Sequence, residues 1–209
     1  MGTVAVQTPS KQQLRTEETL KRLLDAAEKA FVRDGYEAAQ LDEIASGAQR
    51  SKGTVYVHFK SKEDLFLALF EDRTRSIIDR FRINLRECKN AKQSMEVFRE
   101  FYVGLVSDRT WPILTLEFKL FAIRHPESKE RLRKAFEMAK PPQDDATWAQ
   151  MFAHLTREQK RENELFLAAL GPIVSGLMLE SYFEPEILSD KGLRRILGRI
   201  FDALFPTCR

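Results

Sequence analysis

The fold is decided by the stretch LDEIASGAQRSKGTVYVHFKSKEDL, residues 41–65. Its apolar spacing predicts two short helices, 41–47 and 52–58, joined by a tight connection. Ser51 is a favourable N-cap for the second helix, because its hydroxyl can accept a hydrogen bond from an amide of the first turn. Two short helices with this spacing indicate a helix-turn-helix, a unit that lays its second helix in the major groove of DNA.

The charge distribution around this stretch favours the same interpretation. The window from Ile44 to Lys62 contains no Asp or Glu, although it holds four Lys or Arg residues and His58. The whole chain has 34 basic and 31 acidic residues and a net charge of +3, which excludes an acidic solvating chain and a histone-like basic polymer. A basic stretch alone is usually a solvated face, but combined with the helix spacing it predicts a surface that binds phosphates.

Outward from this centre, helical periodicity covers nearly the whole 209-residue chain and strand patterns are almost absent. We expect further helices at 14–34, 62–86, 93–107, 111–124, 127–140, 146–155, 158–183 and 191–205. Gly35 should end the first of these in a left-handed conformation. Gly171-Pro172 should kink or divide the helix at 158–183. The fold class expected is all-α, with a disordered leader at 1–12.

Composition excludes several other classes of protein. With 43% hydrophobic and 10% aromatic residues the chain can bury a core. Cys88 and Cys208 lie too far apart in sequence to suggest a zinc cluster, and no disulfide framework is indicated. The chain has three histidines, no HExxH and no GxSxG, Walker or GxGxxG motif, so we expect no metal, no cofactor and no enzymatic activity.

The chain is also expected to be cytoplasmic, without a membrane partner. No apolar run is found that approaches the roughly 18 residues of a membrane span. The first ten residues, MGTVAVQTPS, lack the basic start and the apolar core of a signal peptide.

Residues 23–70, LLDAAEKAFVRDGYEAAQLDEIASGAQRSKGTVYVHFKSKEDLFLALF, resemble the TetR (tetracycline-repressor) family of bacterial transcriptional regulators. The run SKGTVYVHFKSKEDL is the most specific part, because it keeps its order and spacing across the recognition helix, the turn and the next helix cap. The resemblance implies a three-helix DNA-binding domain at 13–60. It also implies a larger helical bundle for ligand sensing and dimerisation at 61–209.

The residues expected to contact DNA are Ser51, Lys52, Gly53, Thr54, Tyr56, His58, Lys60 and Lys62. Lys52 can donate to guanine O6 or N7, and Gly53 allows the backbone to approach the groove closely. Tyr56, Lys60 and Lys62 are expected at phosphates. His58 is expected there too, although a structural histidine remains the alternative.

The turn departs from the family pattern. The usual Ala-Gly-Val is replaced by Ala48-Gln49-Arg50, and Gln49 can still take a left-handed conformation at a cost of roughly 1 kcal/mol. Arg50 is a candidate for an additional phosphate contact. The usual capping Thr of the second helix is replaced by Gln40, a poorer N-cap.

Thirteen of the 15 phenylalanines follow residue 62, which suggests an aromatic cavity for a small ligand. The candidate ligand-binding residues are Phe98, Tyr102, Trp111, Glu117, Phe118, Phe121, Phe152 and Phe166. Ordinary core packing is the alternative for each of them. Glu117 lies on an apolar stripe and would need a partner if buried, either a neighbouring Arg or a cationic ligand.

The last two expected helices carry apolar stripes that suit self-association. The residues concerned are Ile173, Leu177, Leu193, Ile196, Leu197, Ile200, Phe201 and Leu204. On their own they could equally be core, but the resemblance favours an isologous four-helix interface in a homodimer. Such a dimer presents two recognition helices to successive major grooves.

The function expected is a ligand-responsive transcriptional regulator, most simply a repressor. It would bind palindromic, double-stranded operator DNA as a homodimer, and an unknown small, largely apolar effector would release it. A DNA-binding dimer without a small-molecule ligand, constitutive or controlled by a protein partner, is the alternative. An enzyme is a distant third.

Overall fold

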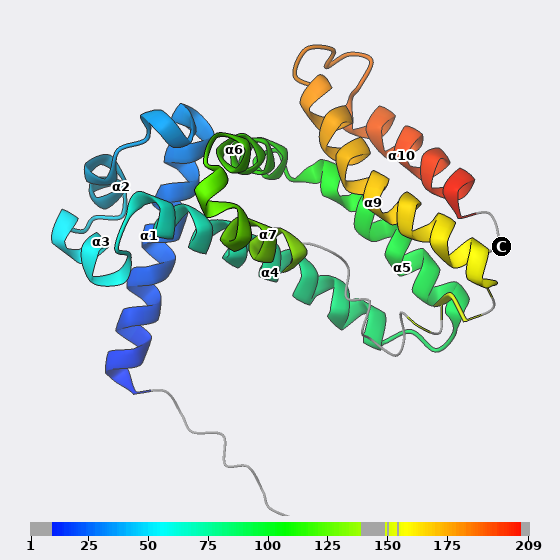
Figure 1. Ribbon diagram of the computed structural model, residues 1–209, viewed down its shortest axis with the longest axis horizontal. Coiled ribbons are helices and arrows are strands. Elements are labelled where there is room, and N and C mark those ends of the chain that lie inside the picture. Colours follow the sequence, from blue (N-terminus) through cyan, green and yellow to red (C-terminus); the bar gives the residue numbers. More distant parts are fainter. Residues whose placement is uncertain (1–9, 139–148, 150, 154, 206–209) are drawn as a thin grey trace, which may run out of the picture. The chain divides into compact units, whose positions relative to one another are not determined.

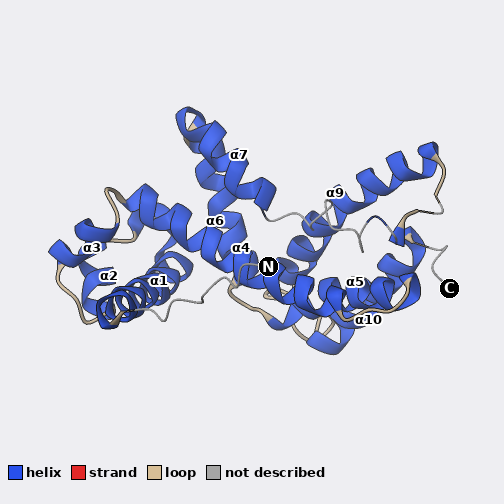
Figure 2. Cartoon of the chain, turned by 90° about the horizontal axis from the view of Figure 1, so that it is seen from below, coloured by secondary structure: helices blue, strands red, loops and turns tan. Residues whose placement is uncertain are grey.

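The computed structural model describes residues 10–138, 149, 151–153 and 155–205. Every regular element within this part of the chain is a helix, which confirms the all-α prediction (Figure 2). The chain divides into two compact units, Met1–Phe70 and Glu71–Arg209. Helix α4, Lys62–Arg86, contains the boundary, so its first turns belong to unit 1 and the remainder to unit 2.

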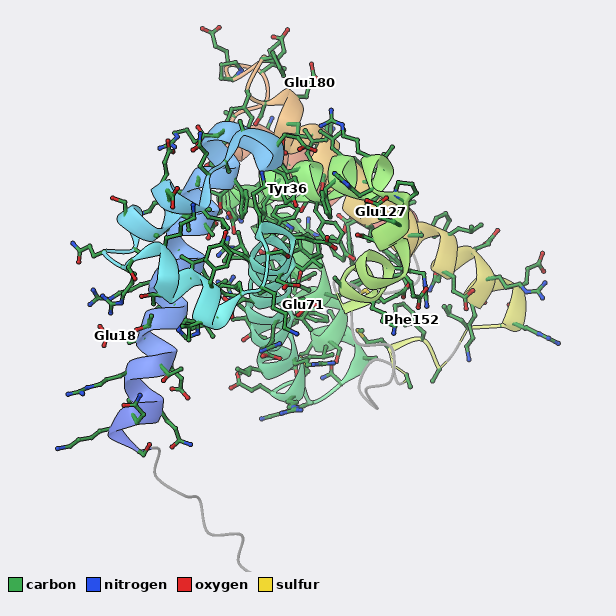
Figure 3. The ribbon with its side chains drawn as sticks, turned by 60° about the vertical axis from the view of Figure 1, so that its left-hand side comes forward. Glu18, Tyr36, Glu71, Glu127, Phe152 and Glu180 are labelled. Atoms are coloured by element: carbon green, nitrogen blue, oxygen red, sulfur yellow. The ribbon has the colours of Figure 1, made fainter. Side chains whose placement is uncertain are left out.

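Unit 1 is built from α1 (Lys11–Ala38), α2 (Leu41–Gly47), α3 (Lys52–His58) and the start of α4. Helix α1 begins at Lys11, where the Ser10 side chain forms a capping box with Gln13. The disordered leader was expected to reach residue 12, but the helix already begins at Lys11. Residues 1–9 lie outside the described residues. The first turns of α1, up to Glu18, are exposed and extend away from α2 and α3 (Figures 1 and 3).

The core of unit 1 joins all of its helices. Leu23, Ala27 and Phe31 of α1 are fully buried, as is Val55 of α3. The Phe31 ring meets Phe66 edge to face, with ring centroids 4.9 Å apart. Helices α1 and α2 and helices α2 and α3 are in direct contact, so this core fixes the position of α3 within the unit.

The end of α1 differs slightly from the prediction. Gly35 has a φ of 77°, which confirms a left-handed value there, but its ψ of 169° is extended. One more helical turn follows and ends at Ala38. This turn places Tyr36 in the core, where burial raises the pKa of its hydroxyl to about 12.

Unit 2 holds the rest of α4 and five further described helices. These are α5 (Ala91–Gly104), α6 (Trp111–Arg124), α7 (Lys129–Met138), α9 (Arg157–Glu180) and α10 (Asp190–Leu204), with 3₁₀ turns at Leu105–Ser107 and Pro126–Ser128. Helices α5, α9 and α10 lie side by side (Figure 1). The helix predicted at 146–155 lies largely outside the described residues.

Helix α9 runs undivided through Pro172, so of the two expected outcomes, a kink or a division, the division does not occur. Proline removes the hydrogen bond to the carbonyl four residues earlier, which here belongs to Ala168. Both residues lie on the exposed side of α9, where water can satisfy that carbonyl.

The same helix corrects the expectation that no apolar run is long enough for a membrane span. One 18-residue window of α9 reaches a mean hydropathy of 1.2, and only 17% of it is buried. A single helix of this kind is weak evidence for a membrane. Leu165, on the exposed side of this helix, is 71% exposed.

Candidate functional site

Helix α3 presents one exposed face. Lys52, Gly53, Tyr56 and Val57 follow one another at i, i+1, i+4 and i+5, and all four are exposed. Tyr56 is 51% exposed and Val57 is 81% exposed. The opposite face, with Val55 fully buried, packs into unit 1. A rigidly held helix with a free face of this kind can enter a groove of a partner.

The start of α3 is fixed by local hydrogen bonds. The Ser51 hydroxyl accepts from the Thr54 amide at 3.2 Å, which confirms Ser51 as the N-cap. The hydroxyl oxygens of Ser51 and Thr54 are also 3.0 Å apart, within hydrogen-bonding distance. In the free protein these two predicted DNA contacts therefore stabilise the helix start.

The Lys52 ammonium, the predicted base contact, forms an ion pair with Asp42 of α2 at 2.9 Å. The Asp42 carboxylate raises the pKa of Lys52 by this hydrogen bond and by its charge. Both side chains are more than half exposed, so the pair contributes little to stability and can open. The segment from Ile44 to Lys62 contains no acidic residue, yet the Asp42 carboxylate lies beside it in the folded protein. The spacing of residues in the sequence did not reveal this neighbour.

The remaining predicted DNA contacts fall into two groups. Lys60 is exposed and His58 is half-buried, with its ring 6.2 Å from that of Phe59. The Lys62 ammonium instead donates to the backbone carbonyls of Glu37 and Ala39, at 2.9 and 3.3 Å. It also lies 4.7 Å from the Tyr36 ring centroid. The Lys62 ammonium therefore stabilises the end of α1 in this structure. The role expected for it was contact with a DNA phosphate.

The turn between α2 and α3 has the predicted unusual backbone. Gln49 adopts a φ of 56°, the left-handed conformation that glycine normally supplies. The Arg50 amide donates to the Ala45 carbonyl at 2.9 Å, closing the end of α2. The Arg50 guanidinium donates to the Gln49 carbonyl at 3.1 Å and to Thr19 at 3.4 Å. Gln40 forms no side-chain cap bond, as expected.

The predicted ligand-binding residues pack inside unit 2. Phe98, Tyr102 and Phe152 belong to its core cluster, and Phe166 packs against it. Burial raises the pKa of the Tyr102 hydroxyl. On α6, Phe118 and Phe121 are buried, while Trp111 and Glu117 are half-buried. Edge-to-face contacts such as Phe98–Phe201, at 5.1 Å, account for these aromatics as core.

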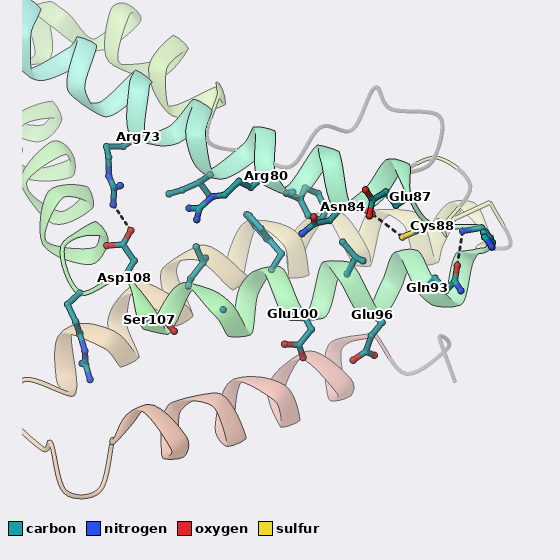
Figure 4. A pocket seen from close by; sticks show the side chains of 18 residues that line it. Arg73, Arg80, Asn84, Glu87, Cys88, Gln93, Glu96, Glu100, Ser107 and Asp108 are labelled. Carbon is teal, nitrogen blue, oxygen red and sulfur yellow. Dashed lines mark hydrogen bonds and ion pairs between the residues drawn. The ribbon is translucent and has the colours of Figure 1, made fainter. Parts of the chain in front are cut away.

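A groove of about 1010 Å³ opens elsewhere in unit 2, between α4 and α5 (Figure 4). Its apolar strip consists of Ile77, Phe81, Val97, Phe101 and Leu105. The rings of Phe81 and Phe101 lie 4.6 Å apart and connect the two helices. None of the eight predicted ligand-binding residues is among those that line this groove.

Charged groups surround the apolar strip in equal numbers. The basic residues are Arg73, Arg80, Lys89 and Arg109, and the acidic ones are Glu87, Glu96, Glu100 and Asp108. Arg73 pairs with Asp108 at one end, and the Cys88 thiol lies near the other (Figure 4). A groove with an apolar floor and balanced charged walls suits an amphipathic ligand. Apolar and charged residues alternate along α4 and α5 as they do on any helix that faces solvent. The sequence pattern therefore does not distinguish the groove residues from those of an ordinary helix surface.

The predicted dimer residues also divide between two environments. Leu193, Leu197 and Phe201 are buried in the core cluster of unit 2, and Ile173, Leu177 and Leu204 pack partly against it. Ile196 is 38% exposed and Ile200 is half-buried. The sequence missed a more exposed stripe on α9, formed by Leu165, Ala168, Pro172 and Gly176 at i, i+3, i+7 and i+11. Leu165 is 71% exposed.

Residues 23–69 match the family model of bacterial regulatory proteins of the tetR family. The chain is 30% identical over 95 residues to the fatty acid metabolism regulator protein of Bacillus subtilis, covering 45% of this chain and 49% of that one. It is 37% identical over 93 residues to the transcriptional activator FasR of Mycolicibacterium smegmatis, covering 44% and 42%. The aligned segments span about half the length of these relatives.

Solved structures extend the likeness in fold to nearly the whole chain. FadR from Bacillus subtilis in complex with stearoyl-CoA has a TM-score of 0.65 and 19% identity, covering 88% of this chain and 96% of that one. FadR from Bacillus halodurans has a TM-score of 0.61 and 18% identity, covering 93% and 96%. At these identities the likeness establishes the fold of the chain.

Proposed function

We propose that this chain, whose residues 23–69 match the family model of the tetR bacterial regulatory proteins, is a ligand-responsive transcriptional regulator. It binds palindromic operator DNA as a homodimer in the cytoplasm and is released by an amphipathic small molecule. The observation that carries the proposal is the exposed face of α3, held in place by the core of unit 1. DNA binding is assigned to that face and the ligand to unit 2.

On DNA, Lys52 leaves Asp42 and donates to a base edge, while Tyr56, His58 and Lys60 contact phosphates. Ser51 and Thr54 orient the start of α3, and Gly53 permits its close approach. We leave Lys62 out of the contacting set because its ammonium is bound to the end of α1.

Homodimerisation is supported by the exposed apolar stripe of α9 and by Ile196 of α10. Among the described residues of unit 2 these side chains stay exposed, and a second copy of the same two helices covers them. A dimer also places two α3 helices about 34–36 Å apart, the spacing of successive major grooves.

The groove between α4 and α5 is the proposed effector site. Its size and its apolar floor suit a ligand with a long apolar part and a polar head, and a structural neighbour of this chain carries stearoyl-CoA. Helix α4 contributes residues to the groove and to both units, so we assign it the role of linking ligand binding to DNA affinity. One relative, FasR of Mycolicibacterium smegmatis, is a transcriptional activator, so the same mechanism serves activation as well as repression, of which repression is the simpler form.

The alternative, a DNA-binding dimer without a small-molecule ligand, makes a different prediction for the groove. It predicts that no amphiphile changes operator affinity. Stearoyl-CoA is the first probe, with Phe101→Arg as the groove variant and Phe183→Arg as a matched control, since Phe183 is 79% exposed and lies outside the groove. Loss of the probe's effect in Phe101→Arg alone supports the effector site.

The central test selects binding sites for the full chain from a random duplex library. We expect an inverted repeat with half-sites one helical turn apart. Lys52→Ala should weaken operator binding by roughly 1–3 kcal/mol, about 10–100-fold, and change binding to random DNA far less. Lys191→Ala, an exposed lysine of α10, is the control. Failure to enrich any sequence would contradict the proposal.

A further inference from the structure

Two residues of the exposed α3 face are not explained by the folding of the chain. Gly53 and Val57 lie at i and i+4, so their positions are adjacent on the helix surface. They lie beside Lys52 and Tyr56, two of the residues already assigned to DNA. Where the fold does not account for the residue type at an exposed position, contact with a partner molecule can account for it.

Gly53 is not required by the space around it. A Cβ atom built there would meet only the Ser51 hydroxyl oxygen, at 3.6 Å, an ordinary van der Waals distance. Glycine is nevertheless one of the least favourable residues inside a helix, and α3 has only seven residues. An alanine would fit and would favour the helix, so packing within unit 1 does not account for the glycine.

Val57 is equally unexplained by packing. Its side chain is 81% exposed, so it buries almost no apolar area within unit 1. A β-branched residue is also a weaker helix former than Ala, Lys or Glu. Its χ1 angle is nearly fixed in a helix, so its two methyl groups are held ready for a contact without further loss of rotamer freedom.

The major groove offers one apolar group along the base edges, the C5 methyl of thymine. We propose that Gly53 and Val57 form a thymine-reading surface. The Val57 methyls pack against that group, and the absence of a side chain at Gly53 lets the base edge approach. This inference rests on the proposed function, because it assumes that α3 enters the groove. It names Val57 as a specificity-determining residue.

The test replaces thymine by uracil, which removes only the C5 methyl. In the selected operator, each thymine is changed to uracil in turn, at symmetric positions in both half-sites. For the wild-type chain we expect one position to lose about fourfold in affinity per half-site, from the burial of one methyl group. The same uracil operator should cost the Val57→Ala variant less than twofold, since the partner of that methyl is gone.

A second variant tests Gly53. Gly53→Ala should keep or raise the melting temperature and lower operator affinity at least tenfold, because the new methyl occupies the space of the base edge. Gly104→Ala is the matched control, since a Cβ there meets no atom within 4 Å and Gly104 lies on α5. It should leave operator affinity unchanged.

The outcomes separate this inference from the proposed function. If no operator is enriched, the proposed function fails and the inference fails with it. If an operator is found and Lys52→Ala weakens it, but no uracil position is sensitive in the wild type, only the thymine-reading surface is wrong. Equal uracil losses in the wild type and in Val57→Ala would assign the methyl contact to another residue and would also overturn it.

Discussion

The two units of this chain use their aromatic and charged residues in opposite ways. In unit 1, the exposed residues that suggest a function in the sequence stay exposed on α3, and the apolar residues between them are buried. In unit 2, most of the aromatics that suggested a ligand site are buried, and the groove combines an apolar floor with charged walls. The position of a short, capped helix can be predicted from local sequence. The position of a cavity depends on the way in which long helices pack against one another.

The largest expected effect is the difference in stability lost when a core residue and a groove residue of unit 2 are each replaced by alanine. Phe98 is fully buried, and Phe98→Ala should lower the free energy of unfolding by about 3–5 kcal/mol. Phe101 lines the groove and is half-buried, so Phe101→Ala should cost only about 1–2 kcal/mol. Urea denaturation at one protein concentration measures both. Equal losses would mean that the groove residue is part of the core.

A second test concerns the exposed stripe of α9. Among the described residues a Cβ atom at Gly176 meets nothing within 4 Å, so Gly176→Arg should leave the folding of the protomer intact. In a dimer packed through α9 the long charged side chain should weaken association by about 100-fold or more. Sedimentation equilibrium measures the dissociation constant. A variant that stays as dimeric as the wild type would place the interface on another surface.

A smaller effect is expected in the turn of unit 1. Gln49 holds a φ of 56°, so Gln49→Gly should remove strain and raise the free energy of unfolding by about 0.5–1 kcal/mol. Thermal and urea unfolding measure this gain. Gln40→Gly, at a residue with an ordinary extended backbone, is the control and should give no such gain.

The smallest effect should come from the ion pair beside α3. Asp42→Asn removes the carboxylate that pairs with Lys52 at 2.9 Å. We expect stability to change by less than about 1 kcal/mol, because both groups are exposed. Affinity for random-sequence DNA should rise about two- to fivefold, since one repulsive charge near the phosphates is lost. Fluorescence anisotropy at several salt concentrations measures it, with Glu43→Asn as the neighbouring control; a fall in affinity would show that Asp42 helps to bind DNA.

Local rules predicted the ends of several helices to the residue. The helices at 41–47, 52–58, 62–86 and 111–124 have their predicted bounds, because caps, turns and Pro112 act within a few residues. Ser51 and Gly35 also behave as their residue types suggest, and Gln49 takes the left-handed backbone that its place in the turn requires. The all-α class followed from periodicity alone.

The rest depended on distances that sequence does not encode locally. Lys62 has the same positive charge as Lys60, but it lies beside the end of α1 and binds its carbonyls. Leu193 and Ile196 are three positions apart on α10, yet one is fully buried and the other is 38% exposed. The side of a helix that faces the core is set by its neighbours, so apolar periodicity did not separate buried from exposed positions.

The thiol of Cys88 gives the groove a built-in reporter. Cys88 lies in the groove wall, is partly exposed and is free of any disulfide. In a Cys208→Ser background Cys88 is the single cysteine of the chain. The rate at which a maleimide alkylates its thiol then measures how accessible the groove is. A compound that occupies the groove slows that rate whatever its identity. The effector can thus be sought in fractionated metabolite extracts by chemical protection, before the operator or the regulated genes are known.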